Sequence, residues 1–396
     1  MNGPGPTLAA PQAELAARLA FVAEADRLKS VDRASTLADG SRRENSAEHS
    51  WHVALWTLIF EEEIRARDAD PDRVITMLLL HDLVEVDAGD HPIHLPRDEP
   101  AIAAAEALAA DRLYGLLPRA QGAALRALWE EFETGQGADA RAARMLDCSQ
   151  PLFQELLRDD LSVIDRDVMR AILTTGRSAP LADDWPELHG HAMALLDRRP
   201  PDSSPDFRHR LAFAVEADRL KTVSRGTTLF DGSRRERSGE HSWHVALMAL
   251  VLAPHADVPA DVARAVRMLL VHDIVEIDAG DNPIHGSFDA AEVERAERKA
   301  ADRLYGMLPE RAGAALRALW DEFEAARTAD ALWGKAIDRV QPVLANLAAG
   351  GGSWRDYPVD MAKMEGRVGA KVKKGAPEIW NALLPDIRAW FAVNRP

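Results

Sequence analysis

The amino-acid sequence contains an internal duplication, which limits the folds open to this chain more than any other feature. Residues 40–55 and 232–247 differ at only two of sixteen positions. The spacing between equivalent residues is 192 in this stretch and 191 further along the chain, so one residue is lost from the second copy in between. A repeat of this length is too long for a solenoid unit and indicates two homologous domains in one chain.

We predict that the two domains span residues 13–197 and 207–396. The linker between them, residues 198–206, is a cluster of prolines and serines in which the helical pattern fails. Residues 1–12 are rich in glycine, proline and alanine and are expected to form a flexible tail. Because the linker is short, we expect the halves to pair as an intrachain pseudo-dimer, with the chain itself a monomer or a further homodimer. The alternative is two independent domains on a linker.

The spacing of apolar residues predicts an all-α fold. No segment shows the sustained alternation of apolar and polar residues that indicates strands. A helix is expected to start near Asn45 or Ser46, both good N-cap residues. A central helix is expected to carry His81-Asp82 and to end at Asp90-His91-Pro92. The other helices predicted in the first half are residues 13–29, 101–116, 119–133, 138–158, 165–175 and 185–197, with a loop at 31–43.

Charge and composition argue against several classes of partner and location. The net charge of −16 and the pI of about 5.3 argue against a nucleic-acid polymer as partner. No apolar run approaches the roughly 20 residues that a membrane helix needs, and the N-terminal residues do not resemble a signal peptide. Cys148 is the single cysteine, so no disulfide can form within the chain, and a cytoplasmic location is expected.

Each half carries two histidines and two aspartates in the same order along the chain. His81 and Asp82 are adjacent and can both reach an ion lodged beside their helix. His49 lies one helix earlier, and Asp147 lies on a later helix. The second half offers His241, His272, Asp273 and Asp338 in the same order. Two imidazoles and two carboxylates suit Mn, Fe, Co, Ni or Zn, so we expect about one divalent transition-metal ion per domain. The alternative for any single histidine is a packed core or capping residue.

Two strings of residues extend this pattern. One reads Ser41-Arg-Arg-Glu44-Asn-Ser-Ala-Glu48-His49-Ser-Trp51, and the other reads His81-Asp82-x-x-Glu85-x-x-x-Gly89-Asp90. Together they closely resemble the HD-domain family, in particular the subfamily that includes bacterial 5′-deoxynucleotidases. The resemblance covers nearly all of each half. It implies an all-helical fold, a divalent metal held by the four residues of each half, phosphomonoester hydrolysis of small nucleotides, and frequent homodimers.

Two pairs of acidic residues beside the metal ligands are expected to take part in catalysis. Glu85 and Glu276 follow their aspartate ligands by three residues, so they share the helix face that holds the metal. There they can orient the attacking water or handle a proton. The resemblance implies the same catalytic role for this glutamate, and it implies that Asp90 and Asp281 contact the sugar.

Basic residues in each half are expected to bind the substrate. Arg33 and Arg225 lie in the loop before the first metal ligand, near the substrate-binding arginine of the resembling family. His94 and His285, in the pattern Asp-x-Pro-Ile-His, are outside the usual four-ligand set and are interpreted as substrate contacts or helix-end residues. The expected partner is therefore a small phosphate ester or nucleotide.

Additional histidines leave an alternative function open. His52 and His244 lie one turn after the first ligand, and together with His94 and His285 they could bind a second metal, as in HD-type di-iron oxygenases acting on a small polar substrate. We favour one metal per half, because those relatives place their additional histidines well beyond the His-Asp pair. A non-catalytic nucleotide-binding protein is the third alternative, and the glutamates beside the metal argue against it.

The two halves differ after the last ligand. The second half continues from Asp338 to the glycine-rich stretch Gly350-Gly-Gly-Ser-Trp354, as in single-domain relatives, whereas the first half lacks this stretch after Asp147. If the halves differ in activity, the first is expected to be the weaker one.

Overall fold

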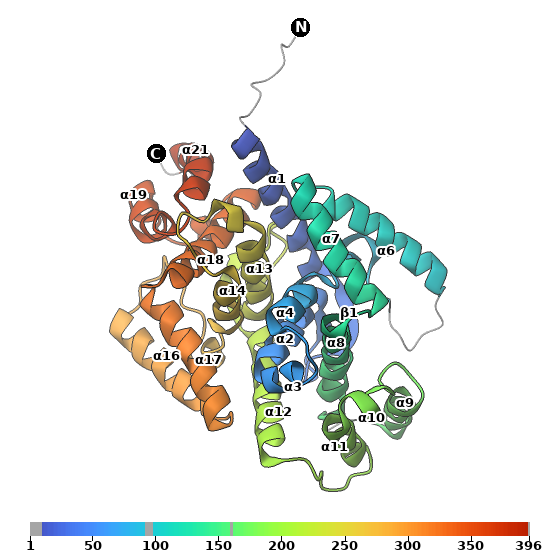
Figure 1. The fold of residues 1–396 in the computed structure, drawn as a ribbon. Helices are drawn as coiled ribbons and strands as arrows, with labels where there is room; N and C mark the ends of the chain where they lie inside the picture. Colours follow the sequence, from blue (N-terminus) through green and yellow to red (C-terminus); the bar gives the residue numbers. More distant parts are fainter. Residues whose placement is uncertain (1–9, 92–97, 159–160, 395–396) are drawn as a thin grey trace.

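The computed structural model describes residues 10–91, 98–158 and 161–394, and most of this chain is helical (Figure 1). The first half contains α1 (Ala10–Ala25), η1 (Asp26–Ser30), β1 (Asp32–Thr36), β2 (Arg43–Asn45), α2 (Ser46–Ile59), α3 (Glu61–Arg65), α4 (Pro71–Leu80), α5 (Glu85–Ala88), α6 (Glu99–Tyr114), α7 (Arg119–Thr134), α8 (Ala138–Leu156), α9 (Val163–Thr174), α10 (Leu181–Asp184) and α11 (Pro186–Leu196).

The second half repeats this order up to the equivalent of α8, with a short 3₁₀ turn in the place of α3, and then departs from it. It contains α12 (Pro205–Ala217), η2 (Asp218–Thr222), β3 (Ser224–Thr228), β4 (Arg235–Arg237), α13 (Ser238–Val251), η3 (Ala253–His255), α14 (Val262–Val271), α15 (Glu276–Ala279), α16 (Ala290–Tyr305), α17 (Glu310–Ala325), α18 (Ala329–Ala348), η4 (Gly352–Arg355), α19 (Met361–Met364), the π-helical turn η5 (Glu365–Gly369), α20 (Ala370–Val372) and α21 (Pro377–Asn394). Among the described helices, none combines the length and apolar character needed to cross a bilayer.

Apart from the central helix, the predicted helices of the first half are present, and α2 shows why the sequence indicates them so clearly. Its start at Ser46 is fixed by a capping box, in which the Asn45 side chain accepts from the Glu48 N–H at 2.9 Å and Glu48 Oε2 accepts from the Asn45 N–H at 3.2 Å. The predicted helices between residues 101 and 197 agree with α6, α7, α8, α9 and α11 to within two residues at each end.

The expectation of a purely helical chain misses one short β-hairpin in each half. β1 pairs with β2 and β3 pairs with β4, both antiparallel. Strands of three to five residues are too short to show alternation in the sequence. Contacts with distant helices help to hold the first hairpin, because the Thr36 N–H donates to Glu155 Oε1 at 3.1 Å and the Ala38 N–H donates to Asp218 Oδ2 at 2.9 Å. The segment at 31–43, expected to be a loop, is therefore partly ordered as a strand.

The predicted central helix is interrupted at its His-Asp pair. Helix α4 ends at Leu80 and α5 begins at Glu85. Between them, the Leu83 N–H donates to Leu80 O at 3.1 Å and the Glu85 N–H donates to Asp82 O at 2.9 Å, which are bonds to the third residue back rather than the fourth. The apolar pattern runs through this turn without a break, so the sequence does not reveal it.

Helices α2 and α13 pack against each other at the centre and join the two halves. All fourteen residues of α2 are buried, as suits a helix that other elements surround on every side. Helix α1 packs on α13, and α12 packs on α2, so the first helix of each half lies against the other half. Figure 1 shows α6 and α7 to one side of this centre and α16 and α17 to the other.

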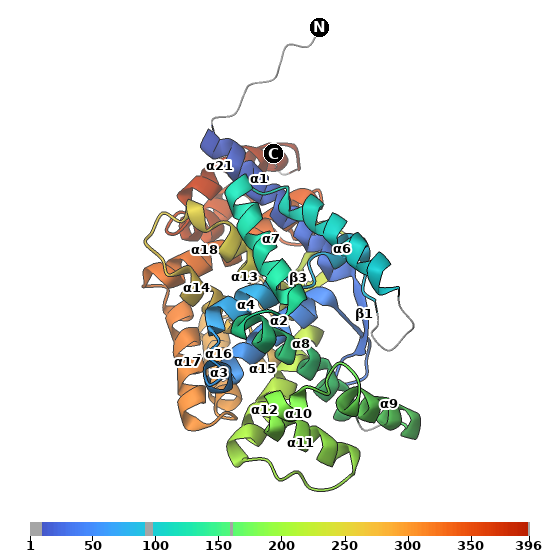
Figure 2. The same cartoon turned by 45° about the vertical axis from the view of Figure 1, so that its right-hand side comes forward.

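The molecule is thus the predicted pseudo-dimer, although the domain limits at 13–197 and 207–396 remain predictions. The halves differ most in their last helices. In both views α9, α10 and α11 lie at the opposite end of the molecule from α21 (Figures 1 and 2).

Two tryptophans connect the central helices to the helix ends of the opposite half. Trp51 Nε1 donates to Leu270 O at 3.0 Å, and Trp243 Nε1 donates to Leu79 O at 3.0 Å. Each carbonyl lies in the last turn of the helix before a His-Asp pair, where carbonyls have no intrahelical partner. Each half therefore caps the helix that presents the ligand pair of the other half.

This capping bond predicts a stability difference between two tryptophans of the same helix. Trp51→Phe removes the donor to Leu270, whereas Trp56→Phe removes an indole N–H that is buried without a hydrogen-bond partner. Both side chains are almost fully buried, so the loss of volume is matched. In urea unfolding, Trp51→Phe is expected to lower the free energy of unfolding by about 1–3 kcal/mol more than Trp56→Phe. Equal losses would show that the bond contributes nothing.

Candidate metal centre

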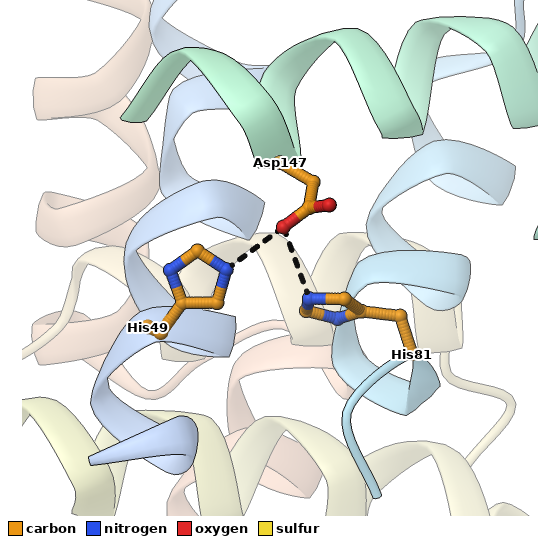
Figure 3. A group of neighbouring side chains, drawn as sticks. All are labelled: His49, His81 and Asp147. Carbon is orange, nitrogen blue, oxygen red and sulfur yellow. Dashed lines mark hydrogen bonds and ion pairs between the residues drawn. The ribbon is translucent and has the colours of Figure 1, made fainter. Parts of the chain in front are cut away.

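Three buried side chains from three parts of the first half converge on one point (Figure 3). His49 lies in α2, His81 directly follows α4, and Asp147 lies in α8. His49 Nε2 is 3.0 Å from Asp147 Oδ1, and His81 Nε2 is 3.6 Å from the same oxygen. One ligand atom from each residue lies within 4.8 Å of the others. Two imidazole nitrogens and a carboxylate oxygen form a donor set suited to a divalent transition metal.

The second half repeats this group with the equivalent residues. His241 lies in α13, His272 follows α14 and Asp338 lies in α18. The Nε2 atoms of His241 and His272 are 3.3 Å and 3.8 Å from Asp338 Oδ1. In each half the structure therefore brings three of the four predicted ligands together.

Two histidine rings are held in the orientation that a metal ligand needs. His81 Nδ1 lies 2.8 Å from Leu78 O, and His272 Nδ1 lies 2.8 Å from Leu269 O. Since a carbonyl only accepts, each ring carries a proton on Nδ1, and Nε2 can serve as a metal ligand when the ring is neutral. Both Nε2 atoms are buried without a hydrogen-bond partner. Buried polar atoms are normally paired, so one ion in each group would satisfy the Nε2 atom there. The residues present therefore fit the metal that the family resemblance implies.

The fourth predicted ligand of each half stands beside this group. Asp82 Oδ1 lies 3.2 Å from His81 Nε2, while its other oxygen bonds the guanidinium of Arg33. The same arrangement holds for Asp273, which lies 3.1 Å from its neighbouring histidine and bonds Arg225 Nη1 at 2.6 Å. The predicted arginines thus reach the edge of the metal group through this aspartate.

The predicted catalytic glutamates are held by serine hydroxyls close to the same aspartates. Ser46 Oγ donates to Glu85 Oε2 at 2.5 Å, and the equivalent serine donates to Glu276 at 2.5 Å. Burial, together with the negative charge of Asp82, raises the pKa of Glu85 well above its usual value. Burial and the charge of Asp273 raise the pKa of Glu276 in the same way. A carboxyl group with a raised pKa is suited to proton transfer near neutral pH.

The aspartates that the resemblance assigns to the sugar also contact the strands that carry the arginines. Asp90 Oδ2 accepts from the Ala34 N–H at 3.3 Å, and Asp281 Oδ2 accepts from the Gly226 N–H at 2.9 Å. Ala34 and Gly226 directly follow Arg33 and Arg225. Each aspartate therefore fixes the backbone beside its arginine, and the sugar contact remains a prediction.

The two histidines assigned to the substrate can be followed in one half only. His94 lies outside the described residues. His285 is partly buried, and its Nδ1 has no hydrogen-bond partner. Burial and the positive charges of Arg367, Arg339 and Lys363 lower its pKa to about 4. Its ring is therefore neutral at neutral pH and lies among cations.

His52 and His244, which were considered as ligands of a second metal, are instead bonded to other protein groups. His52 Nε2 donates to Ala214 O at 2.8 Å, and its Nδ1 lies 2.9 Å from Lys221 Nζ. His244 makes the same two kinds of contact, with Lys29 Nζ at 2.9 Å. Both nitrogens of each ring are engaged by protein groups, which supports the interpretation of His52 as a packed histidine.

Several residues near the metal group were not predicted from the sequence. Glu44 and Ser46 belong to the stretch that is nearly identical in both halves, and this was the available signal. Lys29 and Lys221 also lie in an identical repeated stretch, residues 24–29 and 216–221, but their role appears only in contacts with the opposite half. Arg177, whose Nη2 lies 2.6 Å from Asp147 Oδ2, belongs to no repeated motif.

Comparison with known proteins extends these observations. The family profile of the HD domain matches residues 25–189 and 217–380. The human 5′-deoxynucleotidase HDDC2 is 30% identical over 138 residues, covering 35% of this chain and 66% of that protein. The bovine 5′-deoxynucleotidase HDDC2 is 31% identical over 138 residues, with the same coverage. The chain thus spans just under two thirds of the length of these relatives.

A solved structure also matches one half of the chain. It is described as a predicted metal-dependent phosphohydrolase from Magnetospirillum magnetotacticum MS-1, and it is 42% identical, covering 48% of this chain and 97% of that one with a TM-score of 0.45. The HD-domain profile matches most of the chain, once in each half. The protein therefore belongs to the HD-domain family.

Proposed function

We propose that the protein is a divalent-metal-dependent phosphohydrolase that releases phosphate from small nucleotides or related phosphate monoesters, as a 5′-deoxynucleotidase does. The observation that carries this proposal is the buried His-His-Asp group of each half, with an aspartate, a glutamate and an arginine beside it. The names of the curated relatives narrow the substrate class to nucleotides.

The residues around the group have complementary roles in this reaction. A divalent ion held by the four ligands of one half would acidify a bound water and polarise a phosphoryl oxygen. Glu85 is held near this position by Ser46 and takes a proton as the water oxygen bonds to phosphorus. The bond from phosphorus to the ester oxygen breaks, and that oxygen takes the proton from Glu85 and leaves as the alcohol. Arg33 binds the phosphate oxygens through its guanidinium, and Glu276 and Arg225 act in the same way in the second half.

Contacts of the last ligand favour the second half as the more active one. In the first half, Arg177 Nη2 bonds Asp147 Oδ2 at 2.6 Å. In the second half, Arg339 Nε lies 3.7 Å from Asp338 Oδ2, beyond hydrogen-bond distance, so this ligand is held less tightly by its arginine. The residue equivalent to Arg339 in the first half is Cys148, which carries no positive charge.

The glycine-rich stretch of the second half supports the same asymmetry. Gly352 has a φ of 39°, and a Cβ there would lie 2.6 Å from Asn346 Oδ1, so the close packing of this stretch on α18 requires glycine. The stretch also contacts β3, the strand that carries Arg225. The side chain of Arg225 is 8% exposed, against 15% for Arg33. The second half therefore holds its arginine more firmly.

Metal binding is expected to stabilise the fold and to have a stoichiometry of two ions per chain. At a free Mn²⁺ or Co²⁺ concentration about 100 times the dissociation constant, each occupied centre adds roughly 2.7 kcal/mol to the free energy of unfolding. Chemical denaturation of chelator-treated protein, with and without the ion, measures this gain. The double variant His49→Ala with His241→Ala should lose it, and a gain that survives in the double variant would place the ion elsewhere.

The asymmetry predicts that the two His-Asp pairs differ in importance for turnover. Asp273→Asn is expected to lower kcat for phosphate release by roughly 10- to 100-fold or more, and Asp82→Asn by less, because even the residues that orient metal ligands typically carry effects of 10- to 100-fold. The assay is phosphate release from a panel of nucleoside mono-, di- and triphosphates in metal-loaded protein.

Two outcomes of this assay would contradict the proposal. Equal losses in the two variants would contradict the asymmetry between the halves. The absence of phosphate release by the unaltered chain, over the whole panel and with Mn²⁺ or Co²⁺ bound, would contradict the hydrolase itself and favour a nucleotide-binding role.

A further inference from the structure

Two fully buried lysines cross between the halves. Lys29, in η1 of the first half, directs its Nζ at Glu236 Oε1 at 2.7 Å and at His244 Nδ1 at 2.9 Å, both in the second half. It also donates to Asp26 of its own half. The ammonium group thus has three acceptors for its three N–H bonds, and two carboxylates offset its charge. A buried lysine with this set of partners has a fixed position.

The second lysine repeats these contacts in the opposite direction. Lys221, in η2 of the second half, donates to Glu44 and lies 2.9 Å from His52 Nδ1, both in the first half. It also donates to Asp218 of its own half. The arrangement is therefore reciprocal, because the buried ammonium group of each half bonds to residues of the other half.

The two acidic clusters around these lysines have the spacing of metal sites. In each, two carboxylates and a histidine place one ligand atom apiece within 4.8 Å of one another. The lysine Nζ bonds all three groups, so it occupies the position that an ion would take. These clusters are cation sites filled by the protein itself, and they differ from the open His-His-Asp groups described above.

One cluster is linked directly to a ligand of the proposed metal centre. Glu236 Oε1 accepts from Lys29, and its other oxygen lies 3.2 Å from His241 Nδ1. Gln341 Nε2 donates to Glu236 Oε1 at 2.7 Å and restrains it further. When a histidine binds a metal through one ring nitrogen, the hydrogen-bond partner of the other nitrogen sets the tautomer and the orientation of the ring. Lys29 therefore orients the carboxylate that directs His241 Nε2 towards Asp338.

The equivalent connection in the first half is less direct. His49 Nδ1 bonds Gln150 Oε1 at 2.9 Å, and Glu44 Oε2 lies further away, at 3.7 Å. Gln150 Nε2 lies 3.0 Å from His52 Nδ1, which also contacts Lys221. Lys221 is thus connected to His49 only through the neutral amide of Gln150 and through the longer contact of Glu44.

We propose that each half supplies a positioning lysine to the metal centre of the other half, with Lys29 orienting His241 through Glu236 and Lys221 acting on His49 more weakly. This inference rests on the proposed function, because it assumes that both His-His-Asp groups bind a metal. It goes further in making each centre dependent on a residue from outside its own domain.

The test measures metal affinity at one centre at a time. Asp147→Asn disables the first centre and leaves the second to be titrated with Mn²⁺, while Asp338→Asn does the reverse. Lys29→Met, which keeps the length of the side chain and removes its charge, is expected to weaken Mn²⁺ binding at the second centre by roughly 10- to 100-fold. It should change affinity at the first centre by less than about threefold, since the lysine contacts no ligand there.

Lys221→Met is the matched control on the opposite side. It should weaken the first centre only, and by a smaller factor than Lys29→Met weakens the second. Lys29→Gln, which keeps N–H donors, serves as a second variant if Lys29→Met does not fold. Equal weakening of both centres, no weakening of either, or unfolding of both Lys29 variants would overturn the selective role. If the unaltered chain bound no Mn²⁺, the proposed metal centres would fail as well, which separates that outcome from a failure of the lysines alone.

Discussion

The buried contact between α2 and α13 is the interaction on which the rest of the structure depends. Helix α2 has no exposed face, so the free energy of burying it is available only when the second half covers it. The same helices supply the first histidine of each metal group, and each carries a tryptophan that caps a helix end in the opposite half. The same two helices therefore form the interface and contribute to both sites. A chain with a single half would have an incomplete interface and an incomplete site.

Much of this could be predicted from the sequence, because its signals are local. The duplication, the helix limits and the identities of the convergent histidines and aspartates each follow from spacing along the chain. Features that depend on tertiary contact could not be predicted. The turn at His81 interrupts an apolar pattern that continues through it, and the β1–β2 hairpin is held partly by Glu155 and Asp218, which are distant in sequence. Lys29 looks like an ordinary helix-end lysine until its partners in the other half are known.

A fused pair also explains how the two sites can diverge while the fold is preserved. In the first half, Arg177 bonds the carboxylate of the last ligand, and Cys148 replaces the arginine found in the second half. Neither change affects the α2–α13 contact or the reciprocal lysines. The first half can therefore lose catalytic power and still hold the second half in its working form. Under the proposed asymmetry, the first half would mainly support the fold and the second half would carry out most of the catalysis. The duplication allows the two halves to differ in this way.

The most direct test of this account is anomalous X-ray scattering from crystals of the Mn²⁺-loaded protein, which locates the ions without reference to activity. The account predicts two ions per chain, one between His49, His81 and Asp147 and the other between the equivalent residues of the second half. It also predicts no ion in the two clusters that hold Lys29 and Lys221. An ion found in either lysine cluster, or the absence of ions from both His-His-Asp groups, would contradict it.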